Sequence, residues 1–405
     1  MAAETRSGPM PWRSFLSHYG IYCLPVVVLS YVALESYQID YRAFYLAGKS
    51  VLLGLDPYLN YVGLRPEFYA PINAEDAAFS AFRYPPLAAL LFAPLALFPY
   101  GVSKLVFTLL MLALVVVSAG QIVRRFRGQW PGESLLFALL SFPVLAVVER
   151  GQVDPLMVVL VLAGFTVAGE RRRQGVAGFS LALAGVLKIF PFVVLIEVLA
   201  RRQWRLFMAT CFWGLLLFSA PWLLFGSKVY GHFWQRTFPE QLGVIVNPIA
   251  RDLHGQGIDL GRLARAIDGN GLIISHDFTN GFMNPLLRDS TAGALLVGLL
   301  LALLLEWLGR RANPELRFYA FLNVINLFNP LAWIMGLVWY LPLFFYLYPR
   351  LTRLGRGLLL APLFLPPFLN ANAALAYVIA LVFVRASGSS GWGAGLVAPV
   401  VDALP

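Results

Sequence analysis

Charged residues are scarce in this 405-residue chain. They make up 13% of it, whereas soluble domains carry about 25%; 59% of the chain is hydrophobic, and the mean hydropathy is +0.71. This balance excludes a soluble globule and predicts a protein that crosses a membrane several times. Cysteine is scarce too. Cys23 and Cys211 both fall in apolar stretches, which excludes a disulfide framework and a cysteine-based metal site.

The usual signatures of nucleotide chemistry are also missing. The chain has no P-loop, no glycine fingerprint after a strand, and no Asp-x-Asp pair that would hold a metal-bound nucleotide. A net charge of +10 and a pI near 9.7 would suit a nucleic-acid partner, but every basic run adjoins an apolar segment. Membrane topology explains that charge better. We therefore expect no nucleic-acid partner, no cofactor and no metal.

Apolar runs predict where the chain crosses the membrane, because about 20 apolar residues span a bilayer. Such runs lie at residues 15–36, 101–123, 205–226 and 289–309, and shorter ones at 133–149, 153–169, 316–334, 335–348, 354–369 and 371–385. Arginine clusters flank residues 175–200 on both sides, which predicts a hairpin with Lys188 at its outer tip. About twelve crossings result, with both termini cytoplasmic. Residues 86–98 are too short to cross and are predicted to be re-entrant or interfacial.

The fold class predicted is an all-α polytopic membrane protein with a single domain over residues 1–385. A flexible tail is expected at 386–405, which is rich in Gly, Ser and Ala. Two long outer loops, at about 37–85 and 227–288, contain more Asp, Asn, His and Gly than the crossings. Catalytic or binding residues in these loops would be in contact with water. Tryptophans near the ends of crossings, Trp339 among them, are expected in an interfacial belt.

Asp40 follows the first crossing directly and opens the first outer loop. As a loop residue it is either a solvated acid or the N-cap of a short helix over residues 41–53. The functional alternative is a general base. A base that activates a sugar hydroxyl needs a carboxylate on rigid backbone at the edge of the water phase, and a short helix next to the membrane supplies that backbone.

Several stretches of the chain resemble glycosyltransferase family 87 of the GT-C superfamily. The first-loop stretches are Asp40-Tyr41-Arg42-Ala43-Phe44-Tyr45-Leu46-Ala47-Gly48, Leu53-x-Gly-x-Asp56-Pro57-Tyr58 and Phe82-Arg83-Tyr84-Pro85-Pro86-Leu87. In family order there follow Gly151-Gln152-Val153-Asp154 and Leu187-Lys188-Ile189-Phe190-Pro191. The resemblance covers roughly residues 15–350. It implies a GT-C fold whose outer loops carry short helices next to the membrane.

The resemblance further implies an inverting transferase of a bacterial inner membrane. It would move a sugar, mannose as the first expectation, from a polyprenyl-phosphate-linked donor to a lipid or glycolipid acceptor on the outer side. Asp40 would deprotonate the acceptor. Lys188 and Arg83 are the candidates for the donor phosphate, because charge develops on the leaving oxygen. The expected substrate contacts are Tyr45, Tyr84, Gln152, Asp154, His254, Gln256 and Asn329.

The cationic and polar candidates each have a plainer alternative. Lys188 can extend its ammonium group to the outer lipid headgroups. Arg83 can contact a headgroup or a loop carboxylate such as Asp76. Gln152 and Asp154 can cap the helix that follows them as well as bind a sugar. The residues alone leave these alternatives open.

The chain departs from the family pattern in two places. The Asn-Gln-Ser of the second loop corresponds to Gly255-Gln256-Gly257, and the Ser-Pro-x-x-Trp-x-His-His corresponds to a run from Asn329 to Gly336 that lacks both histidines. Either another residue, such as His254 or His276, replaces them or the substrate differs. The alternative functions are a lipid or solute transporter and a non-catalytic GT-C relative. Transporters usually consist of two similar halves, and no half-repeat is evident here.

Overall fold

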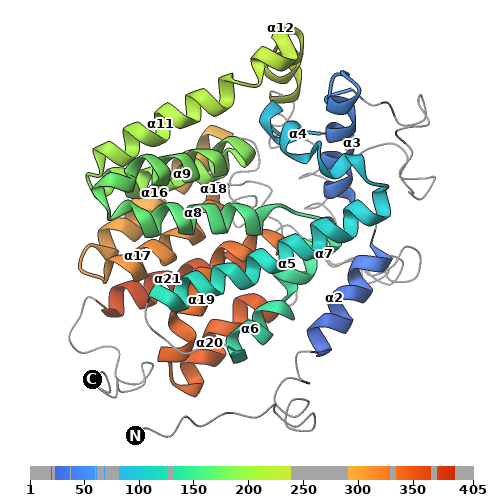
Figure 1. The fold of residues 1–405 in the computed structure, drawn as a ribbon. Helices are drawn as coiled ribbons and strands as arrows, with labels where there is room; N and C mark the ends of the chain where they lie inside the picture. The colour runs from blue at the N-terminus through green and yellow to red at the C-terminus, as the bar shows by residue number, and fades with distance from the viewer. Residues whose placement is uncertain are drawn as a thin grey trace, which may run out of the picture.

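The structure is a computed structural model, and helices joined by short turns make up the part of the chain it describes (Figure 1). That part comprises residues 20, 23–36, 38–59, 61, 68, 82–125, 132–238, 291–328, 334–365 and 372–387. Within it the predicted all-α class is confirmed. His254, Gln256, Asn329 and residues 388–405 of the predicted tail lie outside the described residues. Residues 386 and 387, which are predicted to belong to the tail, end the helix Asn372–Ser387.

The helices follow the predicted apolar runs closely. In the first half they are α2 (Cys23–Glu35), α3 (Ile39–Leu52), α4 (Pro86–Phe92), η4 (Leu95–Leu97), α5 (Tyr100–Arg125), α6 (Gly132–Leu139), α7 (Phe142–Arg150), α8 (Asp154–Ala168), η5 (Arg171–Arg173), α9 (Gln174–Lys188), η6 (Phe190–Val193) and α10 (Val194–Ala200). In the second half they are α11 (Trp204–Ser219), α12 (Trp222–His232), η7 (Phe233–Thr237), α16 (Thr291–Gly309), α17 (Pro314–Phe321), η8 (Leu322–Val324), α18 (Ile325–Phe328), η9 (Ile334–Tyr340), α19 (Leu341–Leu347), η10 (Tyr348–Arg350), α20 (Arg353–Phe364) and α21 (Asn372–Ser387).

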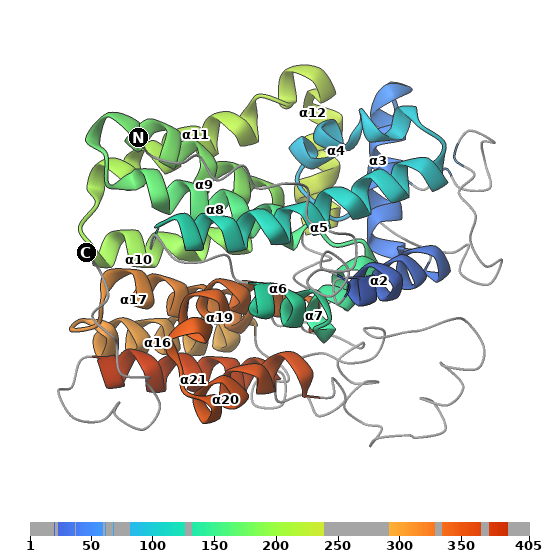
Figure 2. The ribbon, with the colours of Figure 1, turned by 60° about the horizontal axis from the view of Figure 1, so that its bottom comes forward.

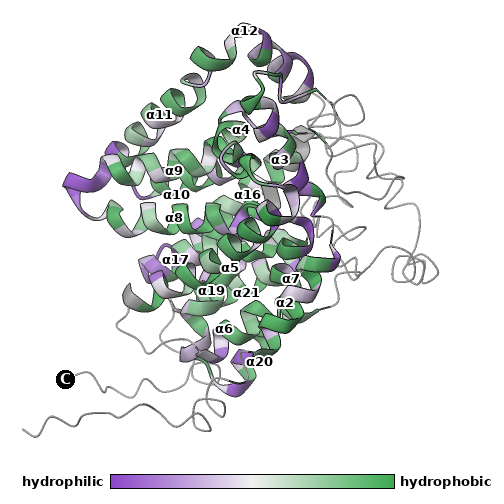
Figure 3. Cartoon of the chain, turned by 45° about the vertical axis from the view of Figure 1, so that its right-hand side comes forward, coloured by the Kyte–Doolittle hydropathy of each residue, from purple (hydrophilic) through white to green (hydrophobic). Residues whose placement is uncertain are grey.

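Most of these helices are shorter than a bilayer is thick. Among the described residues, Tyr100–Val123 of α5 is the one stretch long and apolar enough to span a membrane alone, and the number rises to three if each of two bent helix pairs counts as one span. Hydrophobic residues fill the middles of the longer helices, and hydrophilic residues gather toward their ends (Figure 3). The count of twelve crossings stays a prediction.

Two stretches predicted to be single crossings are bent. Helices α6 and α7 meet at 51° within the run at 133–149, and α11 and α12 meet at 83° within the run at 205–226. At the first break, Pro143 stands in the first turn of α7, where proline lacks an N–H and clashes with the preceding turn. At the second, Pro221 precedes α12, and Gly226 inside α12 departs from helical geometry with a φ of 67° and a ψ of −177°.

The chain reverses direction just after Lys188, at the predicted hairpin tip. Helix α9 ends at Lys188, and Ile189 adopts a positive φ of 57° before η6 begins. The ammonium group of Lys188 meets Asp154, the first residue of α8. The guanidinium group of Arg201, beyond α10, lies 5.1 Å from the ring centroid of Phe165, near the other end of α8. The segment from α9 to α10 therefore runs along α8 and back.

Helix α3 lies across one end of the bundle. Helices α8, α9 and α11 are packed as neighbours, and α5 packs on α8. In two views α3 runs across the direction of α5, at the end where α5 begins (Figures 1 and 2). After its bend, α12 returns toward α3, where the imidazole of His232 meets the carboxylate of Asp56 at 3.1 Å. This end of the bundle holds the residues that the family resemblance singled out.

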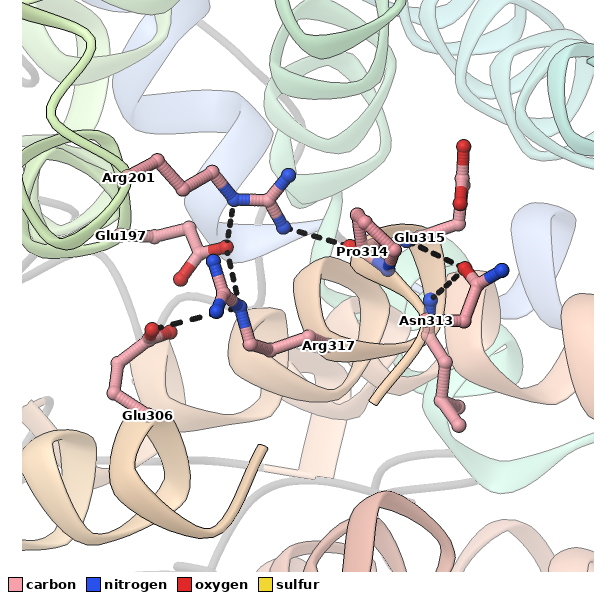
Figure 4. A network of polar contacts seen from close by, with 8 residues as sticks. Glu197, Arg201, Glu306, Asn313, Pro314, Glu315 and Arg317 are labelled. Carbon is pink, nitrogen blue, oxygen red and sulfur yellow. Dashed lines mark hydrogen bonds and ion pairs between the residues drawn. The ribbon is translucent and has the colours of Figure 1, made fainter. Parts of the chain in front are cut away.

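A buried ion-pair network joins helices at the other end (Figure 4). Glu197 of α10, 1% exposed, accepts hydrogen bonds from Arg201 and, at 3.2 Å, from Arg317 of α17. Arg317 also pairs with Glu306 of α16 at 3.6 Å. Helix α10 thus shares one set of charges with α16 and α17, which lie far from it in the sequence. A buried carboxylate of this kind is tolerated only while its cationic partners are present.

We expect Glu197→Ala to destabilise the protein by about 3 kcal/mol, because it leaves two shielded guanidinium groups without their shared carboxylate. Thermal unfolding in detergent measures the effect. The matched control is Glu170→Ala, which breaks an ion pair whose side chains are both 59% exposed and should change stability by less than about 1 kcal/mol. Equal stability losses in the two variants would contradict a stabilising role for the network.

Candidate active site

Asp40 lies in the first turn of α3, and that turn is anchored by its neighbours. Gln38, the residue before the helix, adopts the left-handed conformation, and its side-chain amide donates to Thr108 of α5 at 2.7 Å and to the carbonyl of Val148 of α7 at 2.8 Å. Gln38 therefore occupies the N-cap position without capping through its side chain. The alternative that Asp40 is an N-cap is wrong.

The next residue, Tyr41, packs the same turn onto α5 and onto the loop after α7. Its ring stacks on Phe107 at 4.2 Å between centroids, and its hydroxyl bonds to Ser103. Gly151 permits the close approach. A Cβ on this glycine would lie 2.4 Å from the Cβ of Tyr41, and its φ of 71° is one that residues with side chains rarely adopt. The glycine thus lets α3 sit directly against the turn that carries Arg150 and Gln152.

The carboxylate of Asp40 is held on both oxygens. Arg150, the last residue of α7, donates from Nε to Oδ2 at 2.9 Å and from Nη2 to Oδ1 at 3.2 Å. Gln152 donates from Nε2 to Oδ2 at 2.6 Å. The side chain of Asp40 remains 23% exposed. A forked guanidinium contact fixes a carboxylate in orientation as well as in place, so Asp40 is neither mobile nor simply solvated.

The ammonium group of Lys188 is bound at the neighbouring position. It donates to Oε1 of Gln152 at 3.1 Å and to Oδ2 of Asp154 at 2.5 Å. The other oxygen of Asp154 accepts the indole N–H of Trp339 at 3.0 Å. The side chain of Asp154 is 4% exposed and that of Lys188 is 16% exposed. Asp154 therefore acts in this arrangement as a buried counter-charge that orients the lysine.

Gln152 is the link between the two charged groups. Its amide nitrogen donates to a carboxylate and its amide oxygen accepts from an ammonium group. In the reverse orientation the amide oxygen would face the carboxylate of Asp40 and the amide N–H groups would face the ammonium group of Lys188. These partners therefore fix the amide in one orientation. The contacts form a continuous chain from Arg150 through Asp40, Gln152, Lys188 and Asp154 to Trp339.

Tyr84 borders this chain of contacts. Burial raises the pKa of Tyr84 far above its ordinary value, and the negative charges of Asp40 and Asp154 raise it further, whereas a hydrogen bond to Gln152 lowers it. The hydroxyl therefore stays protonated and can donate. The carbonyl of Tyr84 accepts the hydroxyl of Tyr58 at 2.8 Å, which ties the segment to the first outer loop.

The structure brings together five of the residues predicted from the sequence: Asp40, Tyr84, Gln152, Asp154 and Lys188. Arg83 is exposed and immediately precedes Tyr84. Tyr45 is placed elsewhere. It is 4% exposed, its ring packs edge-on against Tyr100, and its hydroxyl donates to the carbonyl of Phe98 at 3.0 Å. The roles of all these residues stay predictions.

Sequence reasoning missed two members of the site, Arg150 and Trp339. Arg150 could have been recognised from the sequence, because it is a cation predicted to lie on the outer side of the membrane, where basic residues are depleted. Trp339 was expected in an interfacial belt, but it is 2% exposed and donates to Asp154. Nothing in the local sequence distinguishes this tryptophan from one at the lipid surface, because its partner lies 185 residues away.

No group of three or more His, Cys, Asp or Glu side chains that could hold a metal ion occurs within the described residues. The two carboxylates of the site, Asp40 and Asp154, each have their own cationic partner. The expectation that the chain needs no metal stays a prediction.

The sequence model of glycosyltransferase family 87 matches residues 82–335, which is well over half of the chain. The chain belongs to this family. The predictions of the family and of a glycosyltransferase are thereby confirmed, and the transporter alternative is set aside. The match covers Tyr84, Gln152, Asp154 and Lys188, and it begins after Asp40.

Three curated relatives are polyprenol-phosphate-mannose-dependent mannosyltransferases. The alpha-(1-2)-phosphatidylinositol pentamannoside mannosyltransferase of Mycolicibacterium smegmatis is 26% identical over 316 residues, which cover 75% of this chain and 68% of the relative. Alpha-(1-2)-phosphatidylinositol mannoside mannosyltransferases of Mycobacterium tuberculosis and M. smegmatis are 28% and 24% identical; the matches cover 46% and 50% of this chain and 46% and 47% of those relatives. These last two matches thus span about half the length of each relative. No solved structure is significantly similar to the chain.

We expect Gln152→Ala to reduce the turnover of this glycosyltransferase on the order of a hundredfold, because the variant removes the link that holds Asp40 and Lys188 at a fixed separation. Steady-state transfer rates in detergent measure this. The matched control is Gln174→Ala, a glutamine whose amide donates to the Ala168 carbonyl at the far end of α8. Unchanged turnover in Gln152→Ala would show that the link has no catalytic importance.

Proposed function

We propose that this glycosyltransferase moves mannose from a polyprenyl-phosphate-linked donor to a lipid or glycolipid acceptor, with inversion and with Asp40 as the general base. The observation that carries the proposal is the fixed pairing of Asp40 and Lys188 on the two ends of one amide, that of Gln152. A base and a cation held side by side suit a reaction that takes up a proton at one point and releases an anion at another.

The reaction follows from this arrangement. The Asp40 carboxylate takes the proton of an acceptor hydroxyl, and the acceptor oxygen attacks the anomeric carbon of the donor sugar. The bond from that carbon to the phosphate oxygen breaks, and its electron pair remains on the phosphate. A single displacement inverts the anomeric centre, so a β-linked donor gives an α-linked product. Oδ1 of Asp40 is the better placed acceptor of the proton, because it receives one contact, at 3.2 Å, whereas Oδ2 receives two shorter ones.

Lys188 is proposed to receive the phosphate of the donor. Its side chain is 16% exposed and its ammonium group is held next to the base, whereas the side chain of its counter-charge Asp154 is 4% exposed. A phosphate oxygen would bind the third N–H of the ammonium group, which keeps its contacts to Gln152 and Asp154. Arg83, exposed beside Tyr84, is proposed to contact the phosphate from the solvent side.

The active site is proposed to face the outer side of the membrane, with both termini cytoplasmic. Support comes from the distribution of charge along α8. Asp154 at its start belongs to the site, whereas Phe165 near its other end contacts Arg201, and the arginines of η5 follow that end directly. Phe165 lies eleven positions after Asp154 on the helix, which corresponds to roughly 16 Å. Basic clusters mark the cytoplasmic side, so the site lies opposite.

The acceptor is proposed to be a glycolipid with an exposed sugar hydroxyl. The relatives are described as phosphatidylinositol mannoside mannosyltransferases. Phosphatidylinositol mannosides are therefore the first acceptors to test. Neither a metal nor a cofactor is included in the proposal, because Lys188 and Arg83 can supply the positive charge that the phosphate requires.

Asp40→Asn is the decisive variant. We expect purified wild type to transfer labelled mannose from a short-chain prenyl-phosphoryl mannose to a lipid extract, and Asp40→Asn to lose at least about a hundredfold of that rate while still binding the donor, since asparagine keeps the size but cannot accept the proton. The matched control is Glu170→Gln, an exposed carboxylate far from the site.

The outcomes separate the alternatives for this site. Transfer that persists in Asp40→Asn would remove Asp40 as the base. Donor binding by wild type without transfer would show that the sugar or the acceptor is wrong. A wild type that binds neither this donor nor a panel of other prenyl-phosphoryl sugars would favour the non-catalytic relative.

Lys188→Met should weaken donor binding, because methionine keeps the length of the side chain but removes the charge that faces the phosphate. We expect an increase in the donor KM on the order of tenfold or more, measured with prenyl-phosphoryl mannose at saturating acceptor. The matched control is Lys228→Met, an exposed lysine on α12. An unchanged donor KM in Lys188→Met would refute the phosphate contact.

A further inference from the structure

Arg150 is the charged residue of the site that the reaction above leaves without a function. Its guanidinium group holds both oxygens of the proposed base, at 2.9 and 3.2 Å, and its side chain is 13% exposed. An arginine bound to a general base is at first sight unfavourable, because its N–H groups contact both carboxylate oxygens, one of which must accept the proton. The arrangement therefore calls for a compensating benefit later in the reaction.

We propose that Arg150 couples the uptake of the proton by Asp40 to the departure of the phosphate. This inference rests on the proposed function and gives the arginine a part in it. Before reaction, the guanidinium group of Arg150 holds both oxygens of the Asp40 carboxylate. After Asp40 takes the proton, the positive charge of Arg150 faces one negative charge fewer and becomes available to stabilise the phosphate.

The charges balance in this scheme. The O–H bond of the acceptor breaks and an O–H bond to Asp40 forms, so the carboxylate changes from one negative charge to none. The C–O bond to the donor phosphate breaks and leaves its electron pair on the phosphate, so a singly charged diester becomes a doubly charged monoester. One negative charge has thus moved from Asp40 to the phosphate, while the cations Arg150 and Lys188 stay in place.

The geometry allows one arginine to act on both ends of this transfer. Asp40 and Lys188 are bound to the two ends of the same Gln152 amide, so a phosphate on Lys188 lies one side chain away from the carboxylate that Arg150 holds. The groups are largely shielded from water: the side chains of Arg150, Lys188 and Asp154 are 13%, 16% and 4% exposed. In such surroundings a charge acts over this distance more strongly than it does in bulk water.

Arg150 is also fixed in position, as preorganised stabilisation of a transition state requires. It ends α7, and Gly151, which follows it, has the positive φ that ends the helix and allows the tight contact with α3. A flexible surface arginine would have to be ordered during the reaction, whereas this one is ordered by the carboxylate beforehand. We therefore assign Arg150 as a positioning residue that stays in place and whose charge acts on the phosphate once Asp40 is neutral.

The test compares Arg150→Met and Arg150→Lys with wild type in the mannose-transfer assay. We expect Arg150→Met to lower kcat about a hundredfold or more, because the charge is lost, while the KM values for donor and acceptor change less than about threefold. Arg150→Lys keeps the charge but loses the two-pronged guanidinium contact, so its kcat should lie between that of Arg150→Met and that of wild type. The matched control is Arg173→Met, an arginine in an exposed ion pair with Glu170, which should transfer at the wild-type rate.

Chemical rescue distinguishes this role from a purely structural one. Millimolar guanidinium chloride should raise the kcat of Arg150→Ala several-fold, and it should not raise that of Asp40→Asn, where the base itself is missing. Thermal unfolding of each variant checks that the fold is intact. A structural arginine would instead give an unstable protein or raised KM values with no rescue by guanidinium.

The outcomes distinguish a failure of this inference from a failure of the proposed function. If wild type transfers and Arg150→Met keeps a kcat within about threefold of wild type, the inference is overturned and the proposed function stands. Loss of kcat in Arg150→Met with no guanidinium rescue of Arg150→Ala also overturns it. If wild type itself does not transfer, the proposed function fails and the inference fails with it.

Discussion

The pairing of Asp40 and Lys188 through the amide of Gln152 is the interaction on which the rest of the site depends. An amide offers one donor end and one acceptor end, so it can hold an anion and a cation at a fixed separation and in a fixed sense. Arg150 and Asp154 then supply the opposite charge to each partner. The result is a neutral set of four charges, which a largely apolar protein can keep at the end of its helix bundle.

The fold serves this pairing by bringing three separate segments to one place. Helix α3 lies across the end of the bundle with Asp40 in its first turn, the turn between α7 and α8 supplies Arg150, Gln152 and Asp154, and the reversal after α9 supplies Lys188. Gly151 makes the closest of these approaches possible, since any side chain there would collide with Tyr41. At the other end, the Glu197 network joins α10, α16 and α17, so charge stabilises both ends of a bundle whose middle is apolar.

Each positive charge in the site has a different environment, and these environments suit different tasks. Lys188 is paired with a buried carboxylate that the proposed reaction leaves unchanged, and it is the proposed contact for an incoming phosphate. Arg150 balances a carboxylate that is proposed to become neutral during the reaction. The relatives share the dependence on a polyprenol-phosphate-mannose donor, and a donor of that kind releases an anion that needs such charges. The missing family histidines fall at Met335, which is buried, and at Gly336, which faces the amide of Asn326.

The sequence by itself determined the class of protein, the family and most of the residues of the site. Composition is a property of the whole chain, and the stretches around Asp40, Gln152 and Lys188 are short and contiguous, so both can be read without a fold. The tertiary structure decided the partners: Arg150 lies 110 residues from Asp40 and Trp339 lies 185 residues from Asp154. It also decided the bends between α6 and α7 and between α11 and α12. Contacts between distant segments depend on how helices pack, and no local pattern of residues encodes that packing.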